Sequence, residues 1–121
     1  MENRIDKLEE ALKSTNIPLY IDSSFFPENL FDEFSYKIDG NCSNEELDNK
    51  IKELNNMEYN KYIILKINLN NSSEEKQKRF KSIIKDKTYK EYNINSDCKI
   101  LVVCNDLNKI EDEIRSLLLV I

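Results

Sequence analysis

The chain has 121 residues, of which 40% are hydrophobic and 34% charged, with a formal net charge of −5, no histidine and a single glycine. This length predicts one domain over residues 1–121, because a second hydrophobic core would have too few residues. A single glycine excludes the glycine-rich loops that hold phosphates or dinucleotides. The lack of histidine excludes histidine-dependent catalytic triads and zinc sites. Three cysteines are too few for a four-cysteine zinc site and odd for a disulfide framework, so we expect reduced thiols and no metal or cofactor.

The longest apolar run, residues 117–121, has about a quarter of the length that a membrane-spanning helix needs. The N-terminus is charged from its second residue, which is not typical of a signal peptide. We therefore expect a cytoplasmic protein without membrane contact. The abundance of asparagine, lysine and isoleucine is typical of an A+T-rich bacterial or phage genome.

The first half of the chain predicts helices and strands in alternation. We expect a helix over residues 4–14 and a strand over 18–21. A helix should then begin at Pro27 and bury Leu30, Phe31 and Phe34. After it we expect a strand over 36–38, a turn at Asp39-Gly40, and a helix that begins at Ser43 and Glu46 and continues through Leu54. Ser43 and Glu46 have the spacing of a capping box, in which each side chain binds the other residue's backbone N–H.

The second half continues the alternation with two strongly apolar strands, over residues 62–65 and 100–104. Between them we expect a helix that starts at Ser72 or Ser73 and buries Phe80, Ile83 and Ile84, and then an extended excursion over residues 88–94. A short helix around Ile114 and a strand over 118–121 end the chain. Both strong strands are apolar on both faces, so we expect them adjacent in the middle of a parallel sheet.

Three segments of the second half resemble the core of AAA+ ATPases, nearest the MoxR-type group. Residues 64–68 (Ile-Leu-Lys-Ile-Asn) occupy the place of the Walker B strand, and residues 91–97 (Glu-Tyr-Asn-Ile-Asn-Ser-Asp) resemble the excursion that follows it. The strand 100–104 then ends in Asn105, which is similar to the sensor-1 asparagine. The resemblance implies a three-layer α/β sandwich with a mostly parallel five-stranded sheet, a P-loop NTPase-like core. The implied strand order is final, first, fourth, third, second.

The chain departs from that family where the family binds and hydrolyses ATP. Residues 22–29 stand in place of the glycine-rich loop and its lysine, and Leu65 and Lys66 stand in place of the Walker B carboxylates. We also expect the family's helical lid domain to be missing. Without these groups nothing cradles the phosphates, holds magnesium or activates water, so we expect a domain that neither binds nor hydrolyses ATP.

Three groups of residues are candidates for function. Phe25, Phe26 and Asn105 are possible partner contacts, although Asn105 also fits a plain turn. We expect at least one of the two phenylalanines to pack near Leu65 and Cys104 and close the family's cleft; otherwise both form a docking surface. The basic stretch 76–90 offers Lys76, Lys78, Arg79 and Lys81 as possible nucleic-acid contacts, or a solvated helix face. Asp22 and Asp39, at two strand ends, could pair at a metal, or could be turn residues.

The function that these expectations favour is a non-catalytic AAA+-like binding or assembly module. It would act through contacts with a protein partner, such as an active ATPase, or with itself. The alternatives are a small nucleic-acid-binding regulator that uses residues 76–90, or a receiver-like or metal-dependent small enzyme. A receiver domain also has an acid after its first strand, but Lys66 replaces its phosphoacceptor aspartate.

Overall fold

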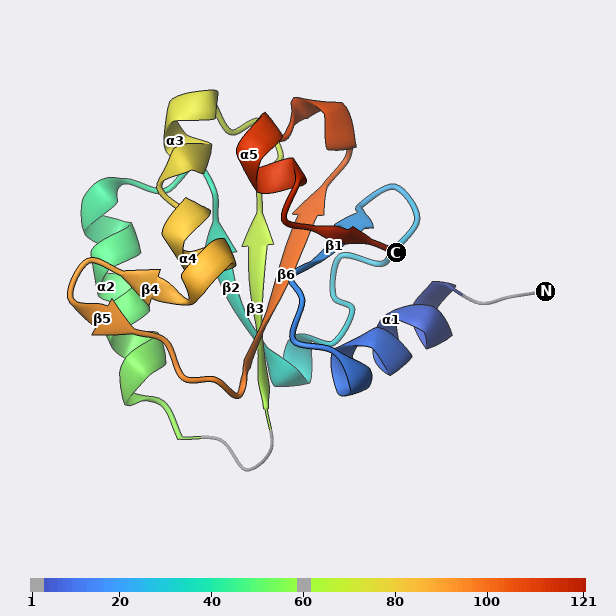
Figure 1. The fold of residues 1–121 in the computed structure, drawn as a ribbon, viewed down its shortest axis with the longest axis horizontal. Coiled ribbons are helices and arrows are strands. Elements are labelled where there is room, and N and C mark those ends of the chain that lie inside the picture. The colour runs from blue at the N-terminus through green and yellow to red at the C-terminus, as the bar shows by residue number, and fades with distance from the viewer. Residues whose placement is uncertain (1–3, 59–61) are drawn as a thin grey trace.

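A parallel β-sheet forms the centre of the protein in the computed structural model, which describes residues 4–58 and 62–121 (Figure 1). Within these ranges the sheet has five strands in the order β2-β3-β6-β1-β7. Their bounds are β1 (Leu19–Asp22), β2 (Ser35–Asp39), β3 (Ile63–Asn68), β6 (Cys98–Cys104) and β7 (Leu119–Val120). The two strongly apolar strands, β3 and β6, are adjacent and neither lies at an edge. The expected strand order is confirmed.

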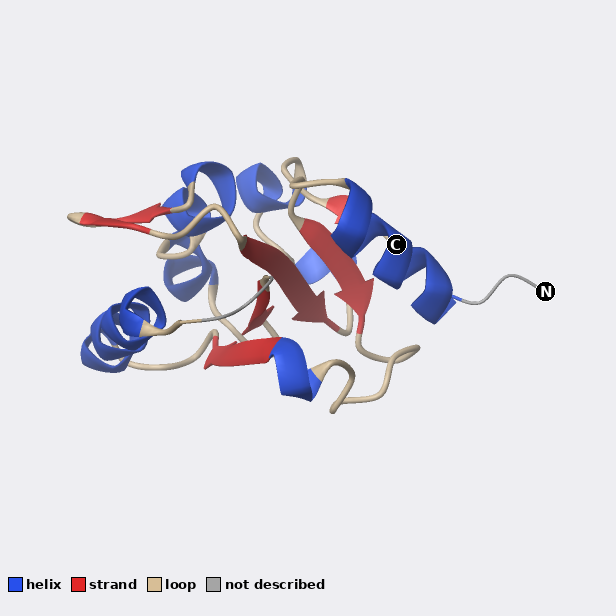
Figure 2. Ribbon diagram, turned by 90° about the horizontal axis from the view of Figure 1, so that it is seen from below, coloured by secondary structure: helices blue, strands red, loops and turns tan. Residues whose placement is uncertain are grey.

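Helices cover both faces of this sheet. The elements besides its strands are α1 (Arg4–Ser14), η1 (Asp32–Phe34), α2 (Asn44–Asn56), α3 (Glu74–Lys78), α4 (Lys81–Asp86), β4 (Thr88–Tyr89), β5 (Tyr92–Asn93), η2 (Leu107–Lys109) and α5 (Asp112–Arg115). Helix α1 packs on one face through Leu8 and Leu12, whereas α2, α4 and α5 pack on the other. Figure 2 shows α1 and α2 on opposite sides of the strands. The short β4–β5 hairpin is the expected excursion and lies beside α2 (Figure 1).

Right-handed crossovers explain which connection covers which face. The chain moves in one direction across the sheet from β2 through β3 and β6 to β7, and the helices of these connections share one face. The step from β1 to β2 runs in the opposite direction, so its connection, residues 23–34, must cross the face that carries α1. Leu30 and Phe31 of that connection do pack into the core beneath α1.

The helix expected from Pro27 is wrong, because residues 23–34 form turns and the single helical turn η1. Phe31 has a left-handed backbone (φ 59°), which no α-helix tolerates, and the turns close through bonds between residues three apart, such as Leu30 N–H to the carbonyl of Pro27. Leu30 and Phe31 are only partly buried, and Phe34 is exposed. The connection spans two intervening strands, and an extended path covers that distance with fewer residues than a helix.

The capping prediction for α2 is confirmed at its N-cap. The Ser43 hydroxyl oxygen accepts a hydrogen bond from the Glu46 backbone N–H at 3.1 Å, and Leu47, Ile51 and Leu54 form the buried face of the helix. Ser73 caps α3 in the same way through the N–H of Lys76. The chain then divides into α3 and α4 rather than continuing as one helix, with Phe80 buried at the junction.

Candidate functional site at the carboxyl ends of the strands

A cavity of about 630 Å³ lies at the carboxyl ends of the central strands, between the sheet and the connection 23–34. Its wall combines apolar side chains with amides and charged groups: Ile21, Ser23, Phe26, Pro27, Glu28, Lys37, Ile38, Asp39, Asn41, Lys66, Asn68, Asn70, Asn71 and Val103. These residues come from β1, β2, β3 and β6 and from the loops that follow β1, β2 and β3. In open α/β sheets this edge is where ligands bind.

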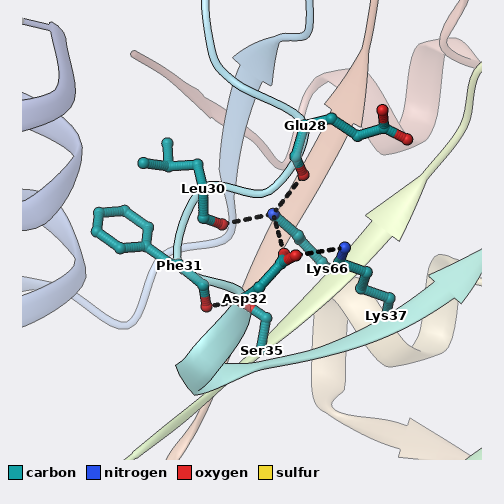
Figure 3. Close-up of polar contacts among 7 residues, drawn as sticks. All are labelled: Glu28, Leu30, Phe31, Asp32, Ser35, Lys37 and Lys66. Carbon is teal, nitrogen blue, oxygen red and sulfur yellow. Dashed lines mark hydrogen bonds and ion pairs between the residues drawn. The ribbon is translucent and has the colours of Figure 1, made fainter.

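Lys66 is the central charged group of the site. It lies on β3 between Lys37 of β2 and Leu101 of β6, and only 6% of its surface is exposed. Its ammonium donates to the carbonyl oxygens of Glu28 (3.2 Å) and Leu30 (2.5 Å) and contacts the Asp32 carboxylate at 3.4 Å (Figure 3). An ammonium has three protons to donate, and here each has an acceptor. Lys66 therefore fastens the connection 23–34 to the sheet.

This geometry changes the pKa values of Lys66 and Asp32. Burial lowers the pKa of Lys66 below its usual value, and the hydrogen bond with Asp32 opposes that change. Asp32 also accepts a hydrogen bond from Lys37 at 2.9 Å, and this bond, helped by Lys66, lowers the pKa of the Asp32 carboxyl. The carboxylate thus carries its charge between two ammonium groups (Figure 3).

The rim of the cavity is made of asparagine and aspartate turns. The carboxylate of Asp39 accepts from the backbone N–H of Asn41, and the side-chain oxygen of Asn68 accepts from that of Asn70. Asn70 then links two strand ends, since its side-chain oxygen accepts from the N–H of Asn105 at 2.7 Å and its amide reaches the Ser23 hydroxyl at 3.5 Å. These bonds hold the loops after β1, β3 and β6 together.

The two candidate phenylalanines lie in different environments. Phe26 is buried and packs with Ile21, Ile64 and Leu101, whereas Phe25 is 60% exposed and stacks under the Arg4 guanidinium at 4.3 Å. One of the two rings, that of Phe26, therefore packs on the sheet. The predicted place near Leu65 and Cys104 is wrong, because those side chains belong to the core of the opposite face.

The cleft is not closed, which corrects a second part of that prediction. Phe26 forms part of the cavity wall and does not fill the space. Successive side chains of a strand point to opposite faces, and the connection 23–34 crosses only the face that carries α1. Phe26 can therefore cover Ile64 and Leu101 while the strand ends beside it stay open.

The proposed pairing of Asp22 with Asp39 is wrong. Their strands, β1 and β2, have β6 and β3 between them, which separates the two residues by about 14 Å at the usual strand spacing. Each carboxylate instead accepts a backbone N–H in its own turn, from Ser24 and Asn41. Within residues 4–58 and 62–121, no group of three or more acidic or cysteine side chains could hold a metal ion.

Asn105 lies just after β6 with an exposed side chain, and its backbone N–H donates a hydrogen bond to the side-chain oxygen of Asn70. Most cations of the basic stretch have partners inside the molecule. Lys76 donates to the Asn41 carbonyl, Arg79 to the Gly40 carbonyl and the Asn44 side chain, and Lys81 pairs with Glu113. Lys78 is exposed. The bonds of Lys76 and Arg79 join α3 to the loop after β2, and the Lys81 pair joins α4 to α5, so these basic residues have a structural role.

Sequence reasoning missed Lys66 and Asn70 as members of a site. Lys66 was weighed only as a missing carboxylate, although a lysine within a run of five apolar or β-branched residues has to find acceptors once it is buried. The cluster Asn68-Leu69-Asn70-Asn71 after a strong strand was the available signal for a polar strand end.

Comparison with known proteins assigns no family to the chain. No protein-family model matches it, and no curated protein matches it significantly. In the described ranges, no helix has the length and apolar character to cross a membrane. Any function must therefore be argued from the site itself.

Proposed function

We propose that the chain is a non-catalytic binding or assembly module with an AAA+-like core, acting in the cytoplasm through protein–protein contacts. The sheet order β2-β3-β6-β1-β7 is the order that the AAA+ resemblance implied, which supports the proposal at the level of fold. Cys42, Cys98 and Cys104 are free and buried, which fits a reducing compartment.

One observation carries the non-catalytic part, namely the direction of the backbone groups around Lys66. A phosphate-binding loop turns its N–H groups toward the ligand, because these donors hold the anion. The connection 23–34 instead turns the carbonyl oxygens of Glu28 and Leu30 inward, onto the Lys66 ammonium. Inward carbonyls would repel a phosphate, and the lysine that binds them stands where the resemblance places magnesium-holding carboxylates.

Nucleotide binding gives the direct test. Thermal unfolding should be unchanged by several millimolar ATP or ADP with magnesium, relative to magnesium alone. A ligand present at 100 times its dissociation constant stabilises a protein by about 2.7 kcal/mol, which is several degrees for a domain of this size. A rise of that size with ATP would overturn the proposal.

The proposal that the chain binds a protein partner or itself is tested by measuring its association. Of the two phenylalanine candidates, Phe25 is the one whose ring is exposed. Sedimentation velocity of the purified chain, with and without the lysate fraction that it retains on a column, should show a complex that Phe25→Ser weakens. The control is Phe34→Ser, which removes another exposed ring, 56% accessible. A chain that stays monomeric and retains nothing would contradict the proposal.

A further inference from the structure

The cavity at the strand ends lies at the point where the chain's connections diverge. The connection after β1 crosses the face that carries α1, whereas the connection after β6 leads through α5 on the opposite face. Neighbouring strands whose connections leave in opposite directions open a crevice at their carboxyl ends. The volume of about 630 Å³ is within the range of small-ligand sites.

The charged side chains of this cavity differ in whether they have a partner of opposite charge. Of its two lysines, Lys66 has three acceptors and Lys37 is paired with Asp32. The cavity's two carboxylates, Glu28 and Asp39, form no ion pair among the described residues. Glu28 points its side chain away from Lys66, which binds the Glu28 carbonyl instead (Figure 3). Both lysines share the one carboxylate of Asp32, so together with Glu28 and Asp39 these five groups carry two positive and three negative charges, a net charge of −1.

The remaining wall of the cavity suits an aliphatic stem. Ile21, Phe26 and Val103 contribute to the core beneath α1 and also border the cavity. The methylenes of a long cationic chain can lie on such a surface while the charged end stays among polar groups. The amides of Asn68 and Asn71, which also line the cavity, add acceptor oxygens for ammonium or guanidinium protons.

We propose that this cavity binds an aliphatic cation, an ammonium or guanidinium group on a methylene stem. The charged end meets the carboxylates of Glu28 and Asp39, and the stem lies on Ile21, Phe26 and Val103. The cation is either a lysine or arginine side chain of a protein partner, in which case the inference rests on the proposed function, or a free amine. An anion would find the Lys66 ammonium with an acceptor for each of its protons and the Lys37 ammonium paired with Asp32.

Titration followed by ¹⁵N-edited NMR tests this proposal with defined probes. The probes are arginine blocked by an N-acetyl and an N-methylamide group, the equally blocked neutral citrulline, and 1,4-diaminobutane. The blocked arginine or the diamine should shift the side-chain amide signals of Asn68 and Asn71 and saturate in the millimolar range, as expected for a ligand of this size. The citrulline derivative should bind at least about tenfold more weakly, because it lacks the charge.

Matched variants localise the effect. Asp39→Asn keeps the oxygen that accepts from Asn41, and Glu28→Gln keeps the carbonyl that binds Lys66, so both should fold. Each should weaken binding about fivefold or more. Glu33→Gln removes the same charge from η1 outside the cavity and should leave binding unchanged. The spectra of the variants without probe check that the fold is kept.

The outcomes distinguish a partner's side chain from a free amine as the ligand, and they test this inference separately from the proposed function. Tighter binding of the blocked arginine indicates a partner side chain, and tighter binding of the diamine indicates a free amine. Equal binding of citrulline, unchanged binding by both cavity variants, or no saturable shift would overturn the inference. None of these results depends on ATP or on sedimentation, so a failure here is distinguishable from a failure of the proposed function.

Discussion

Phe25 and Phe26 are neighbours in the chain but differ in what they contribute to stability. Phe26 is 6% exposed and packs in the core beneath α1, whereas Phe25 is largely exposed with one cation–π contact. Phe26→Ala should lower the free energy of unfolding by about 3 kcal/mol, the usual cost of removing a buried ring. Phe25→Ala should cost about 1 kcal/mol or less, since an exposed cation–π pair contributes little. Urea unfolding measures both, and equal losses would contradict the assigned environments.

Gly40 is required by a close approach of two loops. Its N–H donates to the carbonyl of Asn68 at 2.7 Å, and a Cβ at this position would lie 2.5 Å from that same oxygen and from the Ser72 hydroxyl. Because one neighbour is backbone, it cannot move aside cheaply. Gly40→Ala should therefore cost about 1–3 kcal/mol of unfolding free energy.

Asn41→Ala, in the same turn, is the matched comparison for Gly40. It loses only the side-chain bond to the carbonyl of Asn70, so it should cost about 1 kcal/mol in the same urea titration. If Gly40→Ala proved as stable as the natural chain, the ends of β2 and β3 would have to lie further apart than the structure places them.

Among the elements, the helices and strands could be predicted well and the connection 23–34 could not. Apolar spacing specifies α1 and α2, and apolar runs specify β3 and β6, because these signals are local in sequence. The path of residues 23–34 depends instead on Lys66, which is more than 30 residues away, and on the handedness of the crossover. Local patterns contain no information on such a partner.

Removing the Lys66 ammonium should loosen the connection 23–34. Lys66→Met keeps the length of the side chain but leaves two inward carbonyl oxygens without a donor, at a cost of about 1–3 kcal/mol. Limited proteolysis should then cut within residues 23–34 faster than in the natural chain.

Lys37→Met is the control for the connection, since it removes an equal charge and also a partner of Asp32. The side chain of Lys37 is 52% exposed, so its loss should change stability by less than about 1 kcal/mol and leave the cleavage pattern as it was. Equal behaviour of the two methionine variants would mean that Lys66 does not hold the connection in place.

For the whole molecule, the layered α/β architecture and its strand order could be predicted, but the open cavity could not. The alternating elements and the two apolar runs predicted a parallel sheet with β3 and β6 adjacent, and the AAA+ resemblance implied the full strand order. Whether Phe26 fills or merely borders the strand ends depends on packing between loops. That packing depends on Lys66, Asn70 and Gly40 together. No single pattern in the sequence links these three residues.

The whole protein should lose stability at alkaline pH through its buried phenols. Burial, with the charge of Asp22 second, raises the pKa of Tyr20 to about 12, and burial with the charge of Glu53 raises that of Tyr36 to about 12. In the unfolded chain a tyrosine ionises near pH 10. Between pH 10 and 12 the folded state therefore binds more protons than the unfolded state, and the free energy of unfolding falls as pH rises.

Other buried groups also change the stability at alkaline pH, and a variant can isolate the contribution of one tyrosine. Burial raises the pKa of the Cys98 thiol to about 11, which adds to the fall, whereas burial lowers the pKa of Lys66 and so opposes it below pH 10.5. Urea unfolding at half-unit steps from pH 8 to 12 should show stability declining above pH 10. Tyr36→Phe should make that decline shallower, because it removes one group that the fold keeps protonated. A flat profile above pH 10, or an equal slope in Tyr36→Phe, would show that the ring of Tyr36 is not held away from water.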